Sequence, residues 1–210
     1  MIIRLDSGAA RNQLQTIGAV LDHPEDMLAE SATRVERKLR GHFAERDKTA
    51  NKLGGQRTHY WAQIANSTAV AEVTDRSASV DIGDGRFAQT LHGGEIRAKT
   101  PWPGSGFLLL TIPVHPAAHG RRVSVTARET GLKMTFVGSA RGGVIGHLAA
   151  KAWEDEVYYV AVPSVIQEPD PNAMPPGDEL EKEAIQGAQD YLDIQVQITQ
   201  QQKQSNEPTA

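Results

Sequence analysis

The order of apolar and polar residues predicts helices at the two ends of the chain and a run of strands between them. From Pro24 to about Arg46, apolar residues recur at steps of three and four, which is the spacing of one face of an α-helix. Pro24 and the two acidic residues after it suit the first turn of this helix. A shorter helix is expected over residues 10–21, and a brief helix begins near Thr58.

The strands are predicted from short stretches in which apolar and polar residues alternate between turn residues. The expected strands are 70–73, 79–83, 95–99, 107–112, 132–137, 144–148 and 157–162. Gly142 and Gly143 are expected to form a hairpin turn, and Gly93 and Gly94 a corner after a short helix or turn. Helices, then strands in succession, then a helix indicate an α+β fold, with N-terminal helices packed on a mainly antiparallel β-sheet.

The C-terminal part is predicted to be a linker followed by a helical arm. Four prolines lie between Glu168 and Gly177 and favour a stiff connection. Asp178 is expected to cap the following helix, which carries acidic residues in its first turns. The expected organisation is a core domain (1–166), a Pro-rich linker (167–177), an acidic helix arm (178–203) and a flexible tail (204–210). Truncation after Glu168 is therefore expected to leave a soluble domain that melts normally.

Composition excludes several classes of chemistry and adds little about function. The 210 residues include no cysteine, which excludes disulfides, thiolate metal sites and a cysteine nucleophile. No apolar run approaches the roughly 20 residues that a membrane-spanning helix needs. The first residues do not resemble a signal peptide. These features predict a protein that is made and kept in the cytoplasm, or in something assembled there, and that does not contact a membrane.

Charge is distributed unevenly along the chain, although the net charge is only −4. Residues 34–57 hold eight basic and three acidic side chains, a net charge of +5, and residues 154–210 have a net charge of −10. Such asymmetry can guide contacts between copies or with a polyanion, and two solvated helix faces are the alternative interpretation. The predicted basic face, for DNA or a neighbouring subunit, consists of Arg34, Arg37, Lys38, Arg40, Arg46, Lys48, Lys52 and Arg57. The predicted inter-subunit stripe of the C-terminal arm consists of Leu180, Ala184, Ala188, Tyr191 and Leu192.

No motif for catalysis or for a cofactor is complete in the sequence. His115 and His119 have the i, i+4 spacing of metal ligands, but Pro116 follows the first and no glutamate stands beside it as in zinc proteases. Asp81 and Asp84 lack the remaining ligands of a calcium loop. The sequence therefore predicts no enzyme, no cofactor and no metal. A small hydrolase or nuclease that uses His92, His115 or His119 with Asp81 or Asp84 remains the alternative from another class.

Four segments, taken in order, resemble the virion morphogenesis or tail-completion family of tailed bacteriophages, particularly its Mu-like branch. They are the basic helix and loop from Arg37 to Trp61, the segment Phe87–Lys99, the segment from Leu109 to Arg121, and Val165–Pro171 leading into the acidic helix. Together they cover most of residues 30–192. The segment 100–106 is uncharged here, where members of the family usually carry a strongly basic block.

The resemblance implies a structural virion protein at the head–tail junction, assembled in the host bacterial cytoplasm. Identical subunits would form a ring, a hexamer by analogy, around the DNA channel, in contact with the head connector and tail proteins. Charges of opposite sign at the two ends of the chain suit contacts between neighbouring copies, and a basic face would contact DNA without reading its sequence. A tail tube or sheath terminator, or a baseplate component, is the structural alternative. The family's role is not catalytic, so no catalytic residues are implied.

Overall fold

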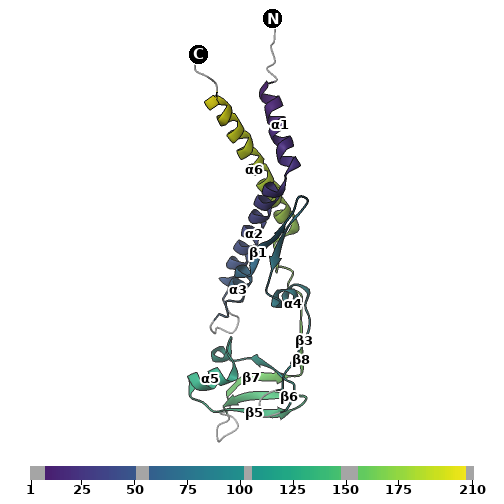
Figure 1. Ribbon diagram of the computed structural model, residues 1–210. Helices are drawn as coiled ribbons and strands as arrows, with labels where there is room; N and C mark the ends of the chain where they lie inside the picture. Colours follow the sequence, from purple (N-terminus) through teal and green to yellow (C-terminus); the bar gives the residue numbers. More distant parts are fainter. Residues whose placement is uncertain (1–7, 51–56, 102–105, 148–155, 207–210) are drawn as a thin grey trace. The chain divides into compact units, whose positions relative to one another are not determined.

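The computed structural model describes residues 8–50, 57–101, 106–147 and 156–206, and it has the predicted α+β composition with antiparallel strand pairs (Figure 1). The chain folds into two compact units, each built from separate segments. Unit 1 comprises residues 1–44, 64–84 and 174–210, and unit 2 comprises residues 45–63 and 85–173. The division differs from the expected core of residues 1–166, because the C-terminal helix belongs to unit 1. The described part contains no helix long and apolar enough to cross a membrane.

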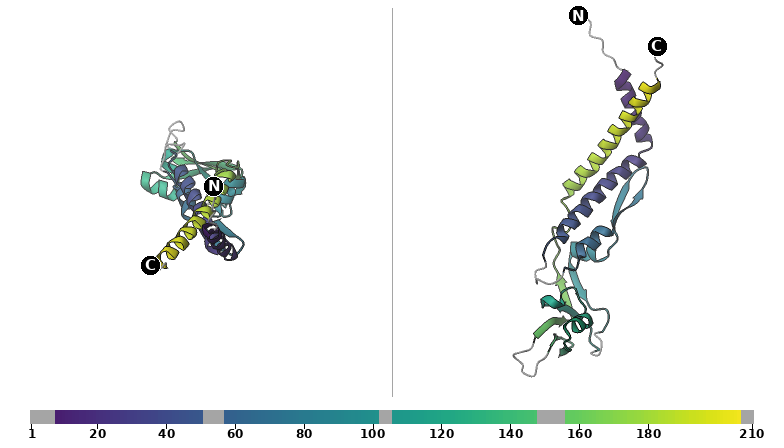
Figure 2. Two further views of the ribbon diagram at one scale, coloured as in Figure 1. Left: turned by 90° about the horizontal axis from the view of Figure 1, so that it is seen from above. Right: turned by 90° about the vertical axis from the view of Figure 1, so that its left-hand side faces the viewer.

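Unit 1 is built around the long helix predicted from the apolar spacing. It contains α1 (Gly8–Asp22), α2 (Glu25–Asp47) as far as residue 44, the end of α3 (Tyr60–Asn66), and α6 (Gly177–Asn206). Strands β1 (Thr68–Val73) and β2 (Ala78–Ile82) form an antiparallel hairpin. In the right-hand view of Figure 2, α2 lies between α6 and this hairpin. Helix α2 therefore has α6 on one side and the β1–β2 hairpin on another.

The buried core of unit 1 contains predicted apolar positions of α2. Ala32, Leu39 and Phe43 are buried, and Ile64 at the end of α3 is fully buried. The buried hydroxyl of Thr68, the first residue of β1, donates a hydrogen bond of 2.9 Å to the Ile64 carbonyl oxygen. This bond satisfies the buried hydroxyl. The periodicity of the sequence predicted which face of α2 is buried, but not that the C-terminal helix would pack against α2 along and beside this face.

Helix α6 packs on α2 of its own chain, which corrects the expectation of a separate arm. The two helices come into close contact where Gly187 faces Ser31. A Cβ atom at Gly187 would lie 2.8 Å from the Ser31 Cα atom and 3.0 Å from the Arg34 Cδ atom. Such distances leave no space for a side chain, because real Cβ contacts are almost never that short. The glycine thus permits the two helix backbones to meet.

Replacing Gly187 by valine is expected to separate α6 from α2. Overpacking a close contact typically costs about 1–3 kcal/mol, and here the neighbouring atom is backbone that cannot move aside. Chemical denaturation should show unit 1 destabilised by that amount. Gly41→Ala is the matched control, because Gly41 lies within α2 with nothing within 4 Å of its added Cβ atom. That variant is expected to be neutral or up to about 1 kcal/mol more stable. Equal stability of Gly187→Val and the wild type would contradict the close crossing.

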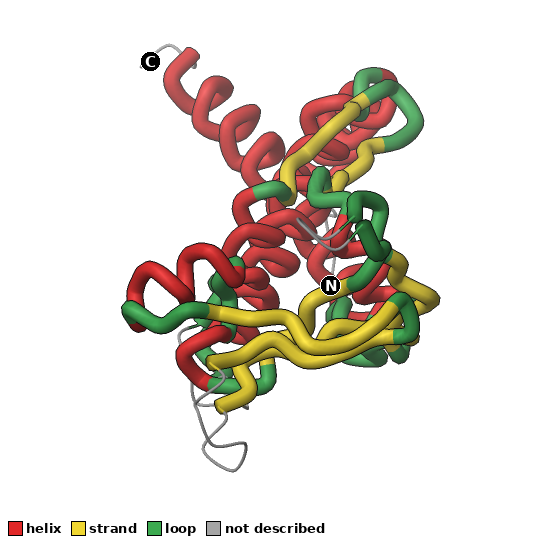
Figure 3. Tube along the Cα trace, turned by 90° about the horizontal axis from the view of Figure 1, so that it is seen from below, coloured by secondary structure: helices red, strands yellow, loops and turns green. Residues whose placement is uncertain are grey.

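Unit 2 contains a four-stranded antiparallel sheet in the order β4-β7-β6-β5. The strands are β4 (Leu110–Pro113), β5 (Met134–Ser139), β6 (Gly142–His147) and β7 (Glu156–Val162). The 3-10 helix η1 (Pro116–Ala118) and α5 (Val123–Thr130) connect β4 to β5. The view from below in Figure 3 shows the strands in yellow. A second, two-stranded sheet pairs β3 (Gly94–Arg97), which follows α4 (Arg86–His92) directly in the sequence, with the distant strand β8 (Ser164–Gln167).

The core of the four-stranded sheet surrounds Tyr159, which is 1% exposed. Its hydroxyl lies 2.5 Å from the hydroxyl of Thr126 in α5 and donates to the Arg121 carbonyl oxygen at 3.2 Å. Leu109, Ile145 and Ala161 complete the buried cluster with Ala118 and Tyr158. This packing fixes α5 and η1 on the sheet.

Several local predictions are confirmed, and others need correction. Gly93 has φ +68° and a Cβ atom there would lie 2.6 Å from the Gln167 carbonyl oxygen, so the glycine corner is confirmed. The β5–β6 hairpin is also confirmed, but its turn is Ala140–Arg141, and Gly142 and Gly143 already belong to β6. Strand β8 was not predicted, because it is short and its partner β3 lies far away in the sequence.

The proline-rich segment, expected to be a stiff linker, is a packed part of unit 2 up to Ala173. The backbone N–H of Asp170 donates to the Thr90 carbonyl oxygen at 2.9 Å, and Ala173 is fully buried. The helix that follows begins at Gly177, one residue before the expected cap, and extends to Asn206. The stiffness indicated by the proline content stays a prediction, and contacts made through backbone atoms leave no signal in composition.

Candidate functional site

The predicted basic face is divided between three environments. Arg34 and Lys38 contact α6, Arg46 and Arg57 lie at a pocket in unit 2, and Arg40 and Lys48 pair within their own segment. Arg37 is exposed and has no ion-pair partner among the described residues. Lys52 lies outside the described residues. Of the seven described side chains, Arg34, Lys38 and Arg46 are therefore engaged within their own units.

The first environment is a charged seam between α2 and α6, defined by Arg34 and Lys38 on one side and Glu179, Glu183 and Asp190 on the other. The Lys38 Nζ atom lies 2.7 Å from a carboxylate oxygen of Glu179. The Arg34 guanidinium donates to the Asp190 carboxylate and lies 3.9 Å from that of Glu183. The sequence predicted these opposite charges for contacts between copies, but here they meet within one chain.

The hydrogen bond across the charged seam shifts the pKa values of both partners. The bond to Glu179 is the largest cause that raises the pKa of Lys38, and it outweighs the opposing effect of burial. The same bond, with the charge of Lys38, lowers the pKa of Glu179. Both shifts favour the charged forms. Both side chains remain well exposed, so the seam orients α6 more than it stabilises the fold.

The charged seam predicts a pH-dependent effect of Glu179→Gln. Because the pKa of Glu179 is lowered on folding, its stabilising effect is present above the ordinary glutamate value and is lost as the pH falls through the folded one. The wild type should therefore be more stable than the variant at pH 7, and the two should become equal well below about pH 4. Urea denaturation at several pH values measures this. A difference that persists undiminished in acid would contradict an ionic contribution.

The second environment holds Arg46 at the end of α2. Its guanidinium carbon lies 4.0 Å from the centre of the Trp61 ring, a cation–π contact. The guanidinium also donates to the Asp170 carboxylate at 2.5 Å and to the Asn172 carbonyl oxygen. One side chain thus joins the start of α3 to the proline-rich segment within unit 2. Arg46 therefore has a structural role that removes it from the predicted basic face.

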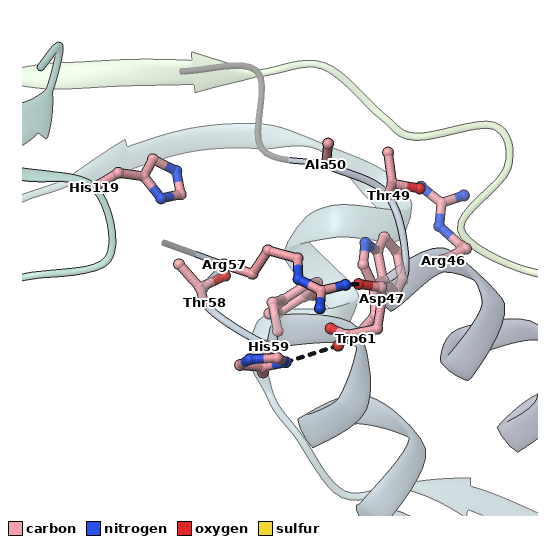
Figure 4. Close-up of a pocket in the computed structure, with 10 residues that line it drawn as sticks. Arg46, Asp47, Thr49, Ala50, Arg57, Thr58, His59, Trp61 and His119 are labelled. Atoms are coloured by element: carbon pink, nitrogen blue, oxygen red, sulfur yellow. Dashed lines mark hydrogen bonds and ion pairs between the residues drawn. The ribbon is translucent and has the colours of Figure 1, made fainter. Parts of the chain in front are cut away.

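Arg46 also lines a pocket of about 390 Å³ in unit 2, beside the N-terminus of α3 (Figure 4). Arg57, Thr58, His59 and His119 are among the other lining residues. The guanidinium of Arg57 donates to the Asp47 carbonyl oxygen at 3.0 Å and is otherwise exposed. In Figure 4, His119 approaches the pocket from a different segment than the other labelled side chains. The pocket is polar, and an anionic group would find N–H donors there.

Asp47 lines this pocket and contacts two residues at the start of α3. One of its carboxylate oxygens lies 2.9 Å from the His59 Nδ1 atom, and the other accepts a bond of 3.2 Å from the Ala62 backbone N–H. His59 has φ +52°, in the left-handed region that a residue with a Cβ atom seldom adopts. Burial raises the pKa of Asp47, but the bonds from His59 and Ala62 and the charges of His59 and Arg57 together lower it. The lowered pKa favours the charged carboxylate of Asp47, which caps α3 by accepting the bond from the Ala62 N–H.

Replacing Arg46 by lysine is expected to loosen the proline-rich segment. Lysine keeps the charge but cannot stack on Trp61 while donating to two acceptors. Since the guanidinium is largely buried, a loss of about 1–3 kcal/mol in the stability of unit 2 is expected. Hydrogen exchange should rise over residues 167–173. Arg40→Lys is the control, because Arg40 is exposed and its ion-pair partner among the described residues is Glu36 on its own helix. A comparable loss in both variants would contradict the role of Arg46.

The histidines of the alternative enzyme hypothesis have local contacts. His115 caps η1, its Nδ1 atom accepting from the Ala117 N–H at 3.2 Å, and its Nε2 atom lies 3.0 Å from the Glu156 carboxylate. His92 ends α4. Both belong to unit 2, whereas Asp81 and Asp84 belong to unit 1. Among the described residues, no group of three or more histidine and acidic side chains is arranged to hold a metal ion.

The predicted stripe of the C-terminal helix is half-buried in unit 1. Leu180 and Ala184 line an apolar groove together with α2 and β2. The Tyr191 hydroxyl lies 3.4 Å from the Asp26 carboxylate, and Ala188 and Leu192 are also half-buried. Sequence reasoning missed a different apolar stripe, on α1. Its signal was available, because Leu14, Ile17 and Leu21 recur at helical spacing.

Comparison with protein-family models, curated proteins and solved structures finds no match to this chain.

Proposed function

We propose that this protein is a structural virion component of a tailed bacteriophage that completes the tail and joins it to the head. Copies would form a ring at the neck around the DNA channel. The proposal rests on the order of the four segments that resemble the tail-completion family, together with one property of the structure. This property is the concentration of exposed apolar side chains on two helices.

The exposed apolar side chains support an assembly of subunits. Among the described residues, eleven large apolar side chains are exposed, and five of them lie on two helices of unit 1. The five are Leu14, Leu21, Ile185, Ile194 and Ile198. Single exposed apolar residues are common on monomers, but a group of them on neighbouring elements is typical of a protein–protein interface. This grouping supports contact between proteins as the activity of the molecule.

Ion pairs within the chain make several side chains of the predicted basic face less available to DNA. Arg34, Lys38 and Arg46 are engaged within their own units, and a phosphate would have to replace those partners. Arg37 and Arg57 keep exposed guanidinium groups. Contact with channel DNA, where it occurs, would involve these two residues and would be independent of sequence.

Deletion of the gene in the phage or prophage that carries it tests the proposal. Electron microscopy of the lysate should show filled heads and complete but unattached tails, and expression of the protein in trans should restore joined particles. Antibody labelling should mark the neck of wild-type virions. Intact infectious particles from the deletion would refute the proposal. Tails of abnormal length, or label at the far end of the tail, would instead favour a terminator or a baseplate component.

A further inference from the structure

Helix α1 has an apolar stripe that the described part of its own chain leaves exposed. Leu14, Ile17 and Leu21 lie on one face at the spacing i, i+3, i+7. Leu14 is 70% and Leu21 58% exposed, and Ile17 is half-buried. The side of α1 that contacts α6 is a different one: Thr16 on that side approaches Thr199 at 3.4 Å. Successive residues turn by about 100° around a helix, so the apolar stripe faces away from α6.

Unit 1 also contains an apolar groove that the side chains of the described residues leave open. It has a volume of about 370 Å³ and lies between α2, β2 and α6. Its walls include Leu28 and Val35 of α2, Val80 of β2, and Leu180 and Ala184 of α6, all half-buried. Buried Ala32 contributes to it as well. An open groove lined by apolar side chains favours an apolar occupant.

The stripe and the groove are compatible in length and chemistry but are kept apart within one chain. Leu14 to Leu21 span about 10 Å of helix, and the α2 wall of the groove, from Leu28 to Leu39, spans about 16 Å and is long enough to accept the stripe. Only His23 and Pro24 connect α1 to α2, and the contact of α1 with α6 holds the stripe on the outer side. The α1 stripe of a second copy of the chain would supply the apolar side chains that this groove can accept.

We infer that the α1 stripe of one subunit docks into the α2–β2–α6 groove of the next. The stripe and the groove are different surfaces. Each subunit therefore inserts its own stripe into the groove of one neighbour and receives the stripe of another neighbour in its own groove. Repetition of such a head-to-tail contact closes a ring when the rotation between neighbours divides a full turn. The inference gives the proposed ring its subunit contact and rests on that proposed function for its biological meaning. The contact itself can be tested on purified protein, without phage.

Cysteine cross-linking of the full-length chain tests the contact, because the natural sequence has no cysteine to interfere. Leu21→Cys is placed on the stripe and Val35→Cys in the groove, each in a chain of distinguishable mass. A mixture of the two variants should form a disulfide-linked heterodimer under mild oxidation, and neither variant alone should cross-link efficiently. Asp22→Cys is the matched control for Leu21→Cys. Asp22 is exposed and follows Leu21 in the sequence, but it lies on another face of α1. Its cysteine variant should therefore cross-link with Val35→Cys at least tenfold less than Leu21→Cys does.

The association state provides the second measurement. Leu14→Glu with Leu21→Glu should convert the assembled protein to monomers in light scattering, with an unchanged circular dichroism spectrum because both positions are exposed in the subunit. Cross-links of Leu21→Cys with itself would show a symmetric contact and overturn the inference. A wild-type protein that stays monomeric at high concentration would overturn it too. Restored head–tail joining by the double glutamate variant would leave the neck function standing but remove this contact from it.

Discussion

Truncation after Pro176 is expected to unfold unit 1 while leaving unit 2 intact. The truncation removes α6, and with it the half-buried side chains of Leu180, Ala184 and Tyr191. Burial of such side chains contributes about 1 kcal/mol or more each, so a total loss of about 3–5 kcal/mol is expected. A loss of that size is a large share of the stability of a small unit. This expectation replaces normal melting, which the sequence predicted for a chain that ends at Glu168.

Hydrogen exchange read by mass spectrometry distinguishes the two units in the truncated chain. Peptides from α2 should lose protection, and peptides from β6 and β7 should keep theirs. Truncation after Gln202 is the control, because it shortens α6 but preserves every residue that contacts α2 through Gly187 and the charged seam. Full protection of α2 after truncation at Pro176 would show that α6 is an independent arm, as the sequence suggested.

Replacing Tyr159 by alanine is expected to be the most destabilising single substitution in unit 2. The side chain is almost fully buried at the centre of the sheet core, and loss of a large aromatic side chain in a core costs about 3–5 kcal/mol. Tyr159→Phe keeps the ring but removes the hydroxyl that contacts Thr126. Because Thr126 is fully buried, that variant is expected to lose about 1–3 kcal/mol.

Urea denaturation of the full-length variants, followed by exchange of the β7 peptides, measures both effects. Val157→Ala provides the control on the same strand, because Val157 is 37% exposed and its truncation should cost less than about 1 kcal/mol. The order of destabilisation is thus Tyr159→Ala, then Tyr159→Phe, then Val157→Ala. A loss in Tyr159→Phe no larger than that in Val157→Ala would mean that the hydroxyl contacts contribute nothing to unit 2.

The charge distribution is a sequence pattern that is compatible both with contacts between copies and with contacts within one chain. Basic residues of α2 and acidic residues of α6 were expected to attract neighbouring copies, and the structure places Lys38 and Glu179 together in one chain. Coulomb attraction does not distinguish a partner within the chain from one outside it. The choice depends on whether the connecting segments let the two helices meet, which is a property of the three-dimensional arrangement.

The sequence by itself determined the features that depend on neighbouring residues. Apolar spacing located α2 and the C-terminal helix, alternation located most strands, and the glycine pair marked the corner at Gly93. These signals are local because helix and strand periodicities arise within a few residues. Only the tertiary structure decided which elements pair: α6 against α2 through Gly187, β8 against β3, and Arg46 between Trp61 and Asp170. Contacts of this kind join residues far apart in the chain, and their energy depends on a geometry that no local pattern encodes.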